Sequence, residues 1–175
     1  VRRVGEAVAL IVAESPVQAR DAAEHIHVDY DPLPAVSEPI AALASDAPRL
    51  WDDAANNLCV DDQKGDVEAV AAAFASAAHV TRLDVVNNRV TGVPMEPRAA
   101  VGDYDSESGE YFLYAGGQGV NRFQRELSAA FDAPMDDIRV VSRDVGGGYG
   151  TRNSLYPEFA LVVWAAKRLG RPVKW

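Results

Sequence analysis

The sequence has a single cysteine and lacks any long apolar run. Cys59 alone excludes a disulfide framework, a cysteine-rich zinc site and an iron–sulfur site within these residues. No segment approaches the roughly 18 apolar residues that cross a bilayer, so we expect no membrane insertion. The sequence also lacks an initiator methionine and a signal-peptide pattern, and both ends have strand-like sequence. We therefore expect a fragment of a longer, cytoplasmic protein.

Acidic residues dominate the charge of the chain. The formal net charge is −9, which argues against nucleic acid or an anionic membrane as a partner. Residues 121–175 differ from the rest, with nine Lys/Arg and six Asp/Glu, whereas residues 1–120 carry eight and twenty. This mildly basic third of the chain suits a phosphorylated cofactor, although a solvated surface explains it equally well.

The residue pattern predicts an α+β protein with three regions. In residues 1–34, an apolar run at 7–13 predicts a strand, the segment Ser15-Pro16-Val17-Gln18 predicts the start of a helix, and residues 26–30 predict a second strand. Residues 35–65 are rich in Pro, Asp, Asn and Ala, and we interpret them as a linker. Residues 66–175 form the third region, which opens on Asp66 as a helix cap.

The third region alternates between strand and helix patterns. Strands are expected around 79–86, 99–105, 110–114 and 138–140, the middle two joined as a hairpin, and Pro172 begins a last strand. One helix should bury a stripe formed by Val120, Phe123, Leu127 and Phe131. A second helix should bury a stripe formed by Leu155, Phe159, Val162, Ala166 and Leu169, and should end at Gly170.

Two strand-to-helix connections are rich in glycine, at residues 115–119 and 146–150. Glycine lets a ligand approach the backbone, and a following helix N-terminus attracts an anion or an oxo group. Two tight turns with nothing bound are the simpler alternative. Neither loop has the phosphate-binding pattern of nucleoside triphosphatases. Arg122 and Asn153 stand where the third glycine of a dinucleotide fingerprint should fall, which disfavours a Rossmann site.

The ordered set of motifs resembles one family. Residues 144–153, DVGGGYGTRN, resemble the Gly-Gly-Gly-Phe-Gly motif of molybdenum hydroxylase large subunits, which include xanthine dehydrogenases, aldehyde oxidases and aerobic carbon monoxide dehydrogenases. Gln118 lies 31 positions before Tyr149, as does the glutamine that these enzymes place beside the metal. Residues 93–99 and 169–175 resemble landmarks on either side of the cofactor-binding region. Residues 4–9 and 28–34 resemble the small a/b hammerhead domain of the family, here truncated to residues 1–34.

The resemblance implies roles for particular residues. Gln118 would donate a hydrogen bond to an oxo ligand of molybdenum, although a surface glutamine that caps the next helix is the simpler reading. Gly147, Gly148, Tyr149 and Gly150 would line the dithiolene end of a molybdenum–pterin cofactor, either molybdopterin or its cytosine dinucleotide form, and Tyr149 and Asn153 would face the substrate pocket. Purine-oxidising members have a glutamate at the position of Asn153, so purine oxidation is disfavoured here.

The intact subunit would hydroxylate an aldehyde or a heterocycle, or oxidise carbon monoxide, with water as the oxygen source. Electrons would leave through iron–sulfur and FAD groups on partner subunits or domains. The family's glutamate base and the second half of the cofactor pocket would lie beyond residue 175, so the chain alone should be inactive. A non-catalytic binding or assembly module with an empty glycine loop is the alternative.

Other candidates are weaker. His25 and His27 would point the same way from a strand but have no evident third ligand, and no protein ligand to a metal is expected. Glu96 and Arg98 could form a buried pair near the site, or a purely structural contact.

Overall fold

The computed structural model describes all 175 residues, and the chain divides into two units. One unit comprises Val1–Val8 and Glu24–Asn87, and the other comprises Ala9–Ala23 and Asn88–Trp175. The predicted boundaries at residues 35 and 66 differ from this division, and the three-region scheme stays a prediction.

The second unit is built on a four-stranded mixed sheet in the order β3-β2-β1-β4. Its strands are β1 (Ala100–Tyr104), β2 (Tyr111–Ala115), β3 (Ile138–Val141) and β4 (Val173–Lys174). β1 pairs antiparallel with β2 and β4, and β2 pairs parallel with β3. Parallel neighbours need a crossover, which α4 (Val120–Phe131) and a 3-10 turn, η2 (Met135–Asp137), provide. The predicted hairpin and the strand at Ile138 are confirmed.

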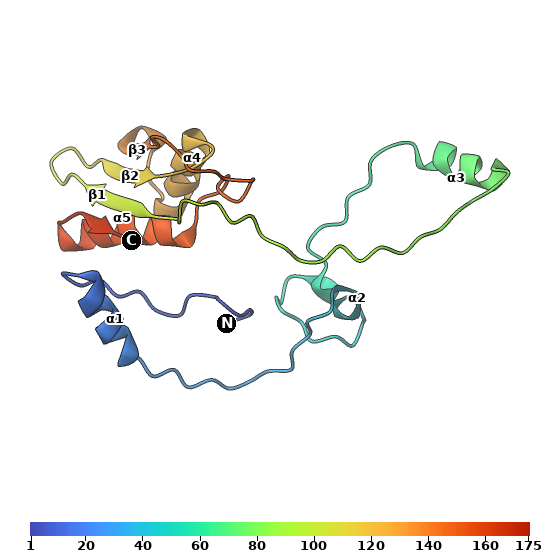
Figure 1. Cartoon of the computed structure of the whole chain (residues 1–175), viewed down its shortest axis with the longest axis horizontal. Helices are drawn as coiled ribbons and strands as arrows, with labels where there is room; N and C mark the ends of the chain where they lie inside the picture. The colour runs from blue at the N-terminus through green and yellow to red at the C-terminus, as the bar shows by residue number, and fades with distance from the viewer. The chain divides into compact units, whose positions relative to one another are not determined.

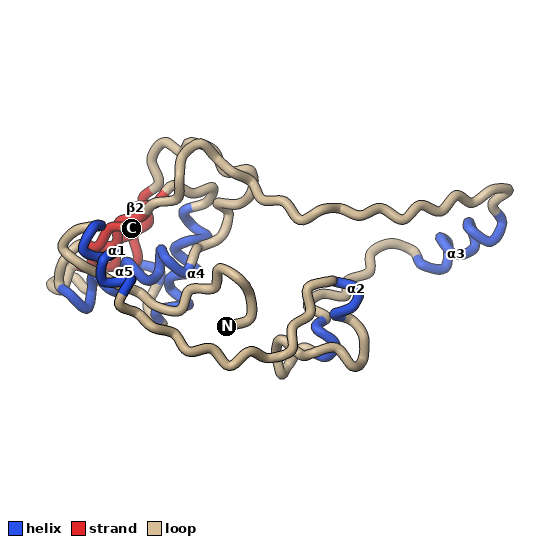
Figure 2. The backbone as a smooth tube through the Cα atoms, turned by 60° about the horizontal axis from the view of Figure 1, so that its bottom comes forward, coloured by secondary structure: helices blue, strands red, loops and turns tan.

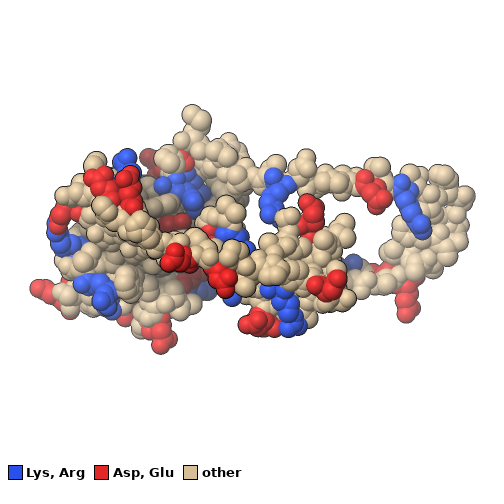
Figure 3. Space-filling view, turned by 90° about the horizontal axis from the view of Figure 1, so that it is seen from below, with Lys and Arg blue, Asp and Glu red and all other residues tan.

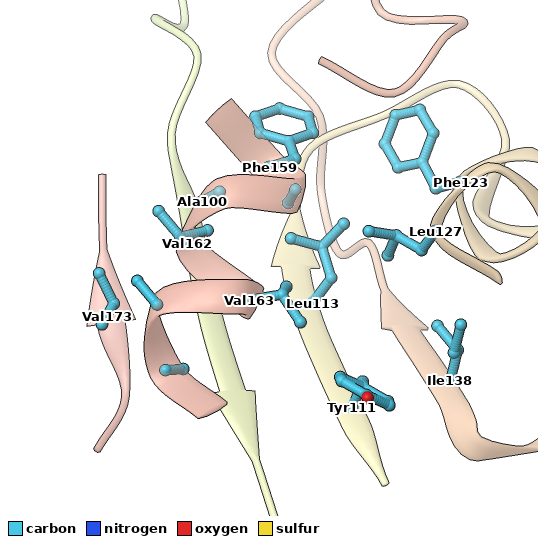
Figure 4. Close-up of a cluster of buried hydrophobic side chains, with 13 residues drawn as sticks. Ala100, Tyr111, Leu113, Phe123, Leu127, Ile138, Phe159, Val162, Val163 and Val173 are labelled. Carbon is cyan, nitrogen blue, oxygen red and sulfur yellow. The ribbon is translucent and has the colours of Figure 1, made fainter. Parts of the chain in front are cut away.

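Two helices, α4 and α5 (Pro157–Leu169), cover one face of the sheet. Figure 4 shows Phe123 and Leu127 of α4 and Phe159 and Val163 of α5 converging on Leu113 of β2. Each of these five side chains is at most 1% exposed. Burying a side chain of this size contributes about 1.5–3 kcal/mol. The core therefore fixes the positions of the strand ends and of the loops that follow them.

The caps of several helices follow the sequence closely. In α1 (Pro16–Glu24) the Gln18 amide donates to Ser15 Oγ at 3.3 Å, and in α3 (Val67–Ser76) the Ala69 amide donates to Asp66 Oδ1 at 2.9 Å. Gly170 ends α5 in the left-handed conformation, with φ of 62°. These three predictions are confirmed because each depends on contacts within one turn of helix.

Three predicted strands are wrong. Residues 7–13, 26–30 and 79–86 have no strand structure, and Figure 2 draws them as loop. Apart from the half-buried Ile11, the apolar side chains along them are exposed, with Val8 at 51% and Val86 at 87%. A strand needs a neighbour that takes up its backbone N–H and C=O groups, and none of these segments has one in this chain. The strand–helix–strand unit of residues 1–34 is thus present only as its helix, α1.

The segment interpreted as a linker contains some local structure. It holds α2 (Pro39–Ala42) and a short 3-10 turn, η1 (Ala55–Asn57). The Asn57 side chain ties the segment together, since its Nδ2 donates to the carbonyls of Ala42 and Pro48, each at 3.0 Å, and its Oδ1 accepts from the Leu50 amide at 2.8 Å.

Candidate functional site

The first glycine loop joins β2 to α4 and is shaped by the core beneath it. A Cβ on Gly117 would lie 2.4 Å from Cε2 of Phe123, a distance that no real side chain shows. The Gly117 amide donates to Ser142 Oγ at 3.2 Å, which ties the loop to the end of β3. Gly119 caps α4 with an extended φ of −168°. The loop leaves the Gln118 side chain exposed.

The second glycine loop does not connect a strand directly to a helix, as the sequence had predicted. It follows β3, but α5 begins only at Pro157, so residues 146–150 do not lead directly into a helix N-terminus. Leu155, expected on the buried stripe, precedes the helix, and Leu169 is 53% exposed. The helix dipole therefore does not act on this loop as the sequence suggested, because it falls off within one helical turn.

The backbone of the second loop is strongly bent. Gly147, Tyr149 and Gly150 all have positive φ, at 99°, 49° and 80°. This conformation costs little for glycine, but it is uncommon for tyrosine. The bends turn the Tyr149 side chain outward, where it is 79% exposed. Asn153 is also exposed, and its amide donates to the Gly150 carbonyl at 3.4 Å.

The two loops meet at Gln118 and Gly148. The backbone amide of Gln118 donates to the backbone carbonyl of Arg152 at 3.0 Å. A Cβ on Gly148 would lie 2.5 Å from Oε1 of Gln118 and 2.7 Å from its Cδ. The glutamine side chain therefore lies directly against the bare backbone of Gly148. The structure brings these two predicted site residues together across a separation of 30 residues.

The pairing proposed between Glu96 and Arg98 is wrong. Glu96 pairs instead with Arg152, whose Nη1 donates to Glu96 Oε2 and whose Nη2 donates to the Glu96 carbonyl. Arg98 lies over the ring of Tyr156, 4.0 Å from its centroid, and over the ring of Trp175 at 5.6 Å. The sequence favoured Arg98 because it is near in the chain, whereas Arg152 is 56 residues away.

Sequence reasoning gave Arg152 no role of its own. Its side chain is only 3% exposed, and its Nε is buried without a partner. Arginine side chains are usually exposed, and nothing in the residues around Arg152 predicts that this one is buried. The only hint is that Glu96 lies in a motif that the resemblance had already picked out.

The Glu96 carboxylate is held in its charged form. It accepts from the Gly146 amide at 2.7 Å as well as from Arg152. These bonds lower the pKa of Glu96 below its ordinary value of 4.5, with the Gly146 amide as the larger cause. A lowered folded-state pKa means that the contact stabilises the fold above about pH 4.5 and is lost as the pH falls through the folded-state value.

The loops offer a bare backbone surface on their outer side. A Cβ on Gly150 would meet no atom within 4 Å. Tyr149, next to Gly150, is exposed, and so is Gln118, which lies against Gly148. Uncharged amides and bare backbone suit a ligand that carries oxo or anionic groups, so these residues fit a molybdenum–pterin cofactor.

A separate cavity of about 310 Å³ lies on the sheet face that carries no helix. It is lined by residues of all four strands or their ends, and it touches the glycine loops only at Ala115 and Gly116. At Gly150, in the second glycine loop, a Cβ would meet open space.

Other candidates gain no support from the structure. No group of three or more His, Cys, Asp or Glu side chains is placed to hold a metal ion, so His25 and His27 have no third ligand. Cys59 is exposed and free. None of the helices has the length and apolarity that crossing a bilayer requires. Acidic and basic side chains are interspersed on the face shown in Figure 3.

Comparison with known proteins identifies the family. Residues 50–175 match the model of the molybdopterin cofactor-binding domain. The chain therefore belongs to this family of cofactor-binding domains, as the glycine motif and Gln118 indicated. The relatives are molybdenum oxidoreductases, and the fold is mixed α+β like theirs.

The relatives include large subunits with different substrates. The chain is 34% identical to the gamma subunit of the 6-hydroxypseudooxynicotine dehydrogenase complex of Paenarthrobacter nicotinovorans, over 98% of this chain and 21% of the relative. It is 33% identical to the carbon monoxide dehydrogenase large chain of Hydrogenophaga pseudoflava, over 96% of this chain and 22% of the relative. The chain thus spans about a fifth of the length of these curated relatives.

Solved structures agree with this assignment. Quinoline 2-oxidoreductase from Pseudomonas putida 86 superposes with a TM-score of 0.80 at 36% identity, over 93% of this chain and 20% of that one. Reconstituted carbon monoxide dehydrogenase from Oligotropha carboxidovorans superposes with a TM-score of 0.83 at 31% identity, over 93% and 22%.

Proposed function

We propose that the chain forms part of the molybdopterin-binding subunit of an oxidoreductase that hydroxylates an aldehyde or a heterocycle, or oxidises carbon monoxide. Water is the source of the added oxygen, and an electron pair leaves the site. The family match and the relatives support this reading. The observation that carries it is the Gln118 side chain against the bare backbone of Gly148. Asn153 argues against purine oxidation, because an amide cannot supply the charge of a glutamate.

Each residue of the loops has a distinct task in this proposal. Gln118 donates a carboxamide N–H to an oxo group without adding a charge to the site. Gly147, Gly148, Tyr149 and Gly150 line the dithiolene end of the cofactor, and the outward side chains of Tyr149 and Asn153 border the substrate. When bound, the molybdenum centre supplies the two-electron redox chemistry.

Partners complete the enzyme. The name of one relative places it in a dehydrogenase complex as the gamma subunit, which supports partner subunits for this chain as well. In this proposal, iron–sulfur and FAD groups on such subunits or domains accept the electrons. The first 34 residues belong to a hammerhead domain in this proposal, followed by a linker to residue 65 and then by the cofactor-binding region.

Substitution of Gln118 tests the proposal. In the complete subunit loaded with cofactor, Gln118→Ala should lower kcat about 10- to 100-fold, the usual cost of losing a partner near a metal centre. Gln118→Glu should do the same, because the ionised carboxylate has the same shape but cannot donate. The measurements are dye-linked oxidation rates and molybdenum per subunit.

Two outcomes of this experiment separate the alternatives. Wild-type rates in both variants, with molybdenum present, would remove Gln118 from the site. A complete subunit that binds no molybdenum and oxidises none of the three substrate classes would favour the non-catalytic assembly module instead.

The 175-residue chain alone should not turn over substrate. Its loops are open on their outer side, and no atom lies within 4 Å of the Cβ position of Gly150. We expect the isolated chain, incubated with cofactor and desalted, to retain far less molybdenum than the complete subunit, measured by elemental analysis. Stoichiometric molybdenum with turnover in the isolated chain would contradict this expectation.

A further inference from the structure

Arg152 is the one buried charge beside the loops. Its side chain is 3% exposed, whereas the arginines of the pairs Arg139–Glu110, Arg171–Glu14 and Arg122–Glu126 are 62%, 66% and 41% exposed. Exposed pairs such as these contribute little to stability. Burying a guanidinium is costly unless its bonds are well made, so its place between the loops calls for an explanation.

The bonds of the Glu96–Arg152 pair reach both loops. Glu96 Oε2 accepts from the Gly146 amide at 2.7 Å, at the start of the second loop. The backbone carbonyl of Arg152 accepts from the backbone amide of Gln118, in the first loop, at 3.0 Å. The ion pair and the backbone of Arg152 together therefore join three segments that are far apart in the sequence.

Two glycines make room for the pair. A Cβ on Gly146 would lie 2.6 Å from Glu96 Cβ, and a Cβ on Gly116 would lie 3.1 Å from Nη1 of Arg152. Neither position has a positive φ, so backbone conformation does not require glycine there. At these two positions the loops are bare because the ion pair occupies the space of a side chain.

We propose that Glu96 and Arg152 are positioning residues that hold the Gln118 carboxamide against Gly148. This inference rests on the function proposed for Gln118. The pair acts through the backbone: Arg152 fixes the Gln118 peptide, and Glu96 fixes the peptide that leads into Gly147 and Gly148.

Arg152→Met is the most informative variant. It removes the buried charge and keeps an apolar chain of similar length, and it leaves Glu96, at 39% side-chain exposure, free to turn toward water. In the complete subunit with cofactor we expect kcat to fall about 10- to 100-fold while KM and molybdenum content stay unchanged. Arg139→Met, which breaks an exposed pair between β3 and Glu110, the residue before β2, is the control and should keep wild-type kcat.

A double variant tests whether the pair acts through Gln118. If it does, Arg152→Met should cause no further loss of kcat in a Gln118→Ala background. An undiminished loss in that background, or wild-type kcat in the single variant, overturns the inference. Gln118→Ala alone tests the proposed function, so the two failures are distinguishable.

Hydrogen exchange gives a readout that needs no cofactor. In the 175-residue chain, the backbone amides of Gly146 and Gln118 should exchange about tenfold faster or more in Arg152→Met. Without the guanidinium, Glu96 turns away from the Gly146 amide, and the Arg152 peptide that accepts from the Gln118 amide is no longer anchored. The amides of β2 should be unchanged. Should that variant fail to fold, Arg152→Lys keeps the charge but not the second bond to the Glu96 carbonyl, and it should show the same effect on the Gln118 amide. Unchanged exchange at both amides in a folded variant rejects the pair as the anchor.

Discussion

Replacing Gly102 with alanine should destabilise the second unit by about 3 kcal/mol, at the upper end of the usual cost of overpacking a core. Gly102 lies in β1 and pairs with Leu113 and Val173 on either side. A Cβ there would lie 2.4 Å from the backbone nitrogen of Val163 and 2.5 Å from the carbonyl carbon of Val162. Backbone atoms of a helix cannot rotate away as a side chain can. The whole of α5 would have to lift from the sheet, loosening the contacts that Figure 4 shows at Val163 and Phe159.

Urea unfolding of the chain, followed by circular dichroism, measures this effect. Gly119→Ala is the matched control, since its Cβ would come no nearer than 3.9 Å to any atom and its φ is extended. That control should lose at most about 1 kcal/mol, the cost of a poorer helix cap. Equal stability of the two variants would show that α5 does not press on Gly102 in solution.

Replacing Gly148 with alanine should cause a large loss of activity but, unlike the change at Gly102, little loss of stability. The new Cβ would again be impossibly close to an atom, at 2.5 Å, but that atom is Oε1 at the end of the flexible Gln118 side chain. The glutamine can rotate away at small cost, and the carboxamide then leaves its place. We expect kcat of the complete, cofactor-loaded subunit to fall about 100-fold, the usual cost of losing one well-placed donor.

Stability and activity must be measured together to test this. Gly148→Ala should unfold at the same urea concentration as the wild type and should match Gln118→Ala in kcat. A double variant of both should be no slower than either single variant, because the two changes remove the same contact. If Gly148→Ala kept wild-type kcat, the carboxamide would not need the position that the structure gives it.

Much of the fold could be predicted from local pattern. The hairpin of β1 and β2 follows from alternation and a turn, and the caps at Ser15, Asp66 and Gly170 follow from residue type. The stripe on α4 was correct at its centre, where Phe123 and Leu127 are fully buried. At its edge it was not, since Val120 is 37% exposed. Periodicity gives the direction of a buried face, but its width depends on what packs against it.

Prediction failed where a partner distant in the sequence decides the outcome. The apolar run at 7–13 has the composition of a buried strand, yet it is not a strand because no neighbour pairs with it. Glu96 was given Arg98 as a partner, and the structure gives it Arg152. Gly102 was not singled out at all, because a glycine in a strand pattern does not reveal that a helix backbone crosses it.

The glycine loops show most clearly which features depend on the sequence alone and which depend on the tertiary structure. The sequence by itself determined which residues are glycine, where the adjoining strands and helices form, and which family the motifs resemble. Only the tertiary structure decided what each glycine faces. Gly146 faces Glu96, Gly148 faces Gln118, and Gly150 faces open space. A missing Cβ has no effect by itself: its consequence depends on the atoms that occupy the vacant volume, and in the first two cases those atoms come from residues 30 to 50 positions away.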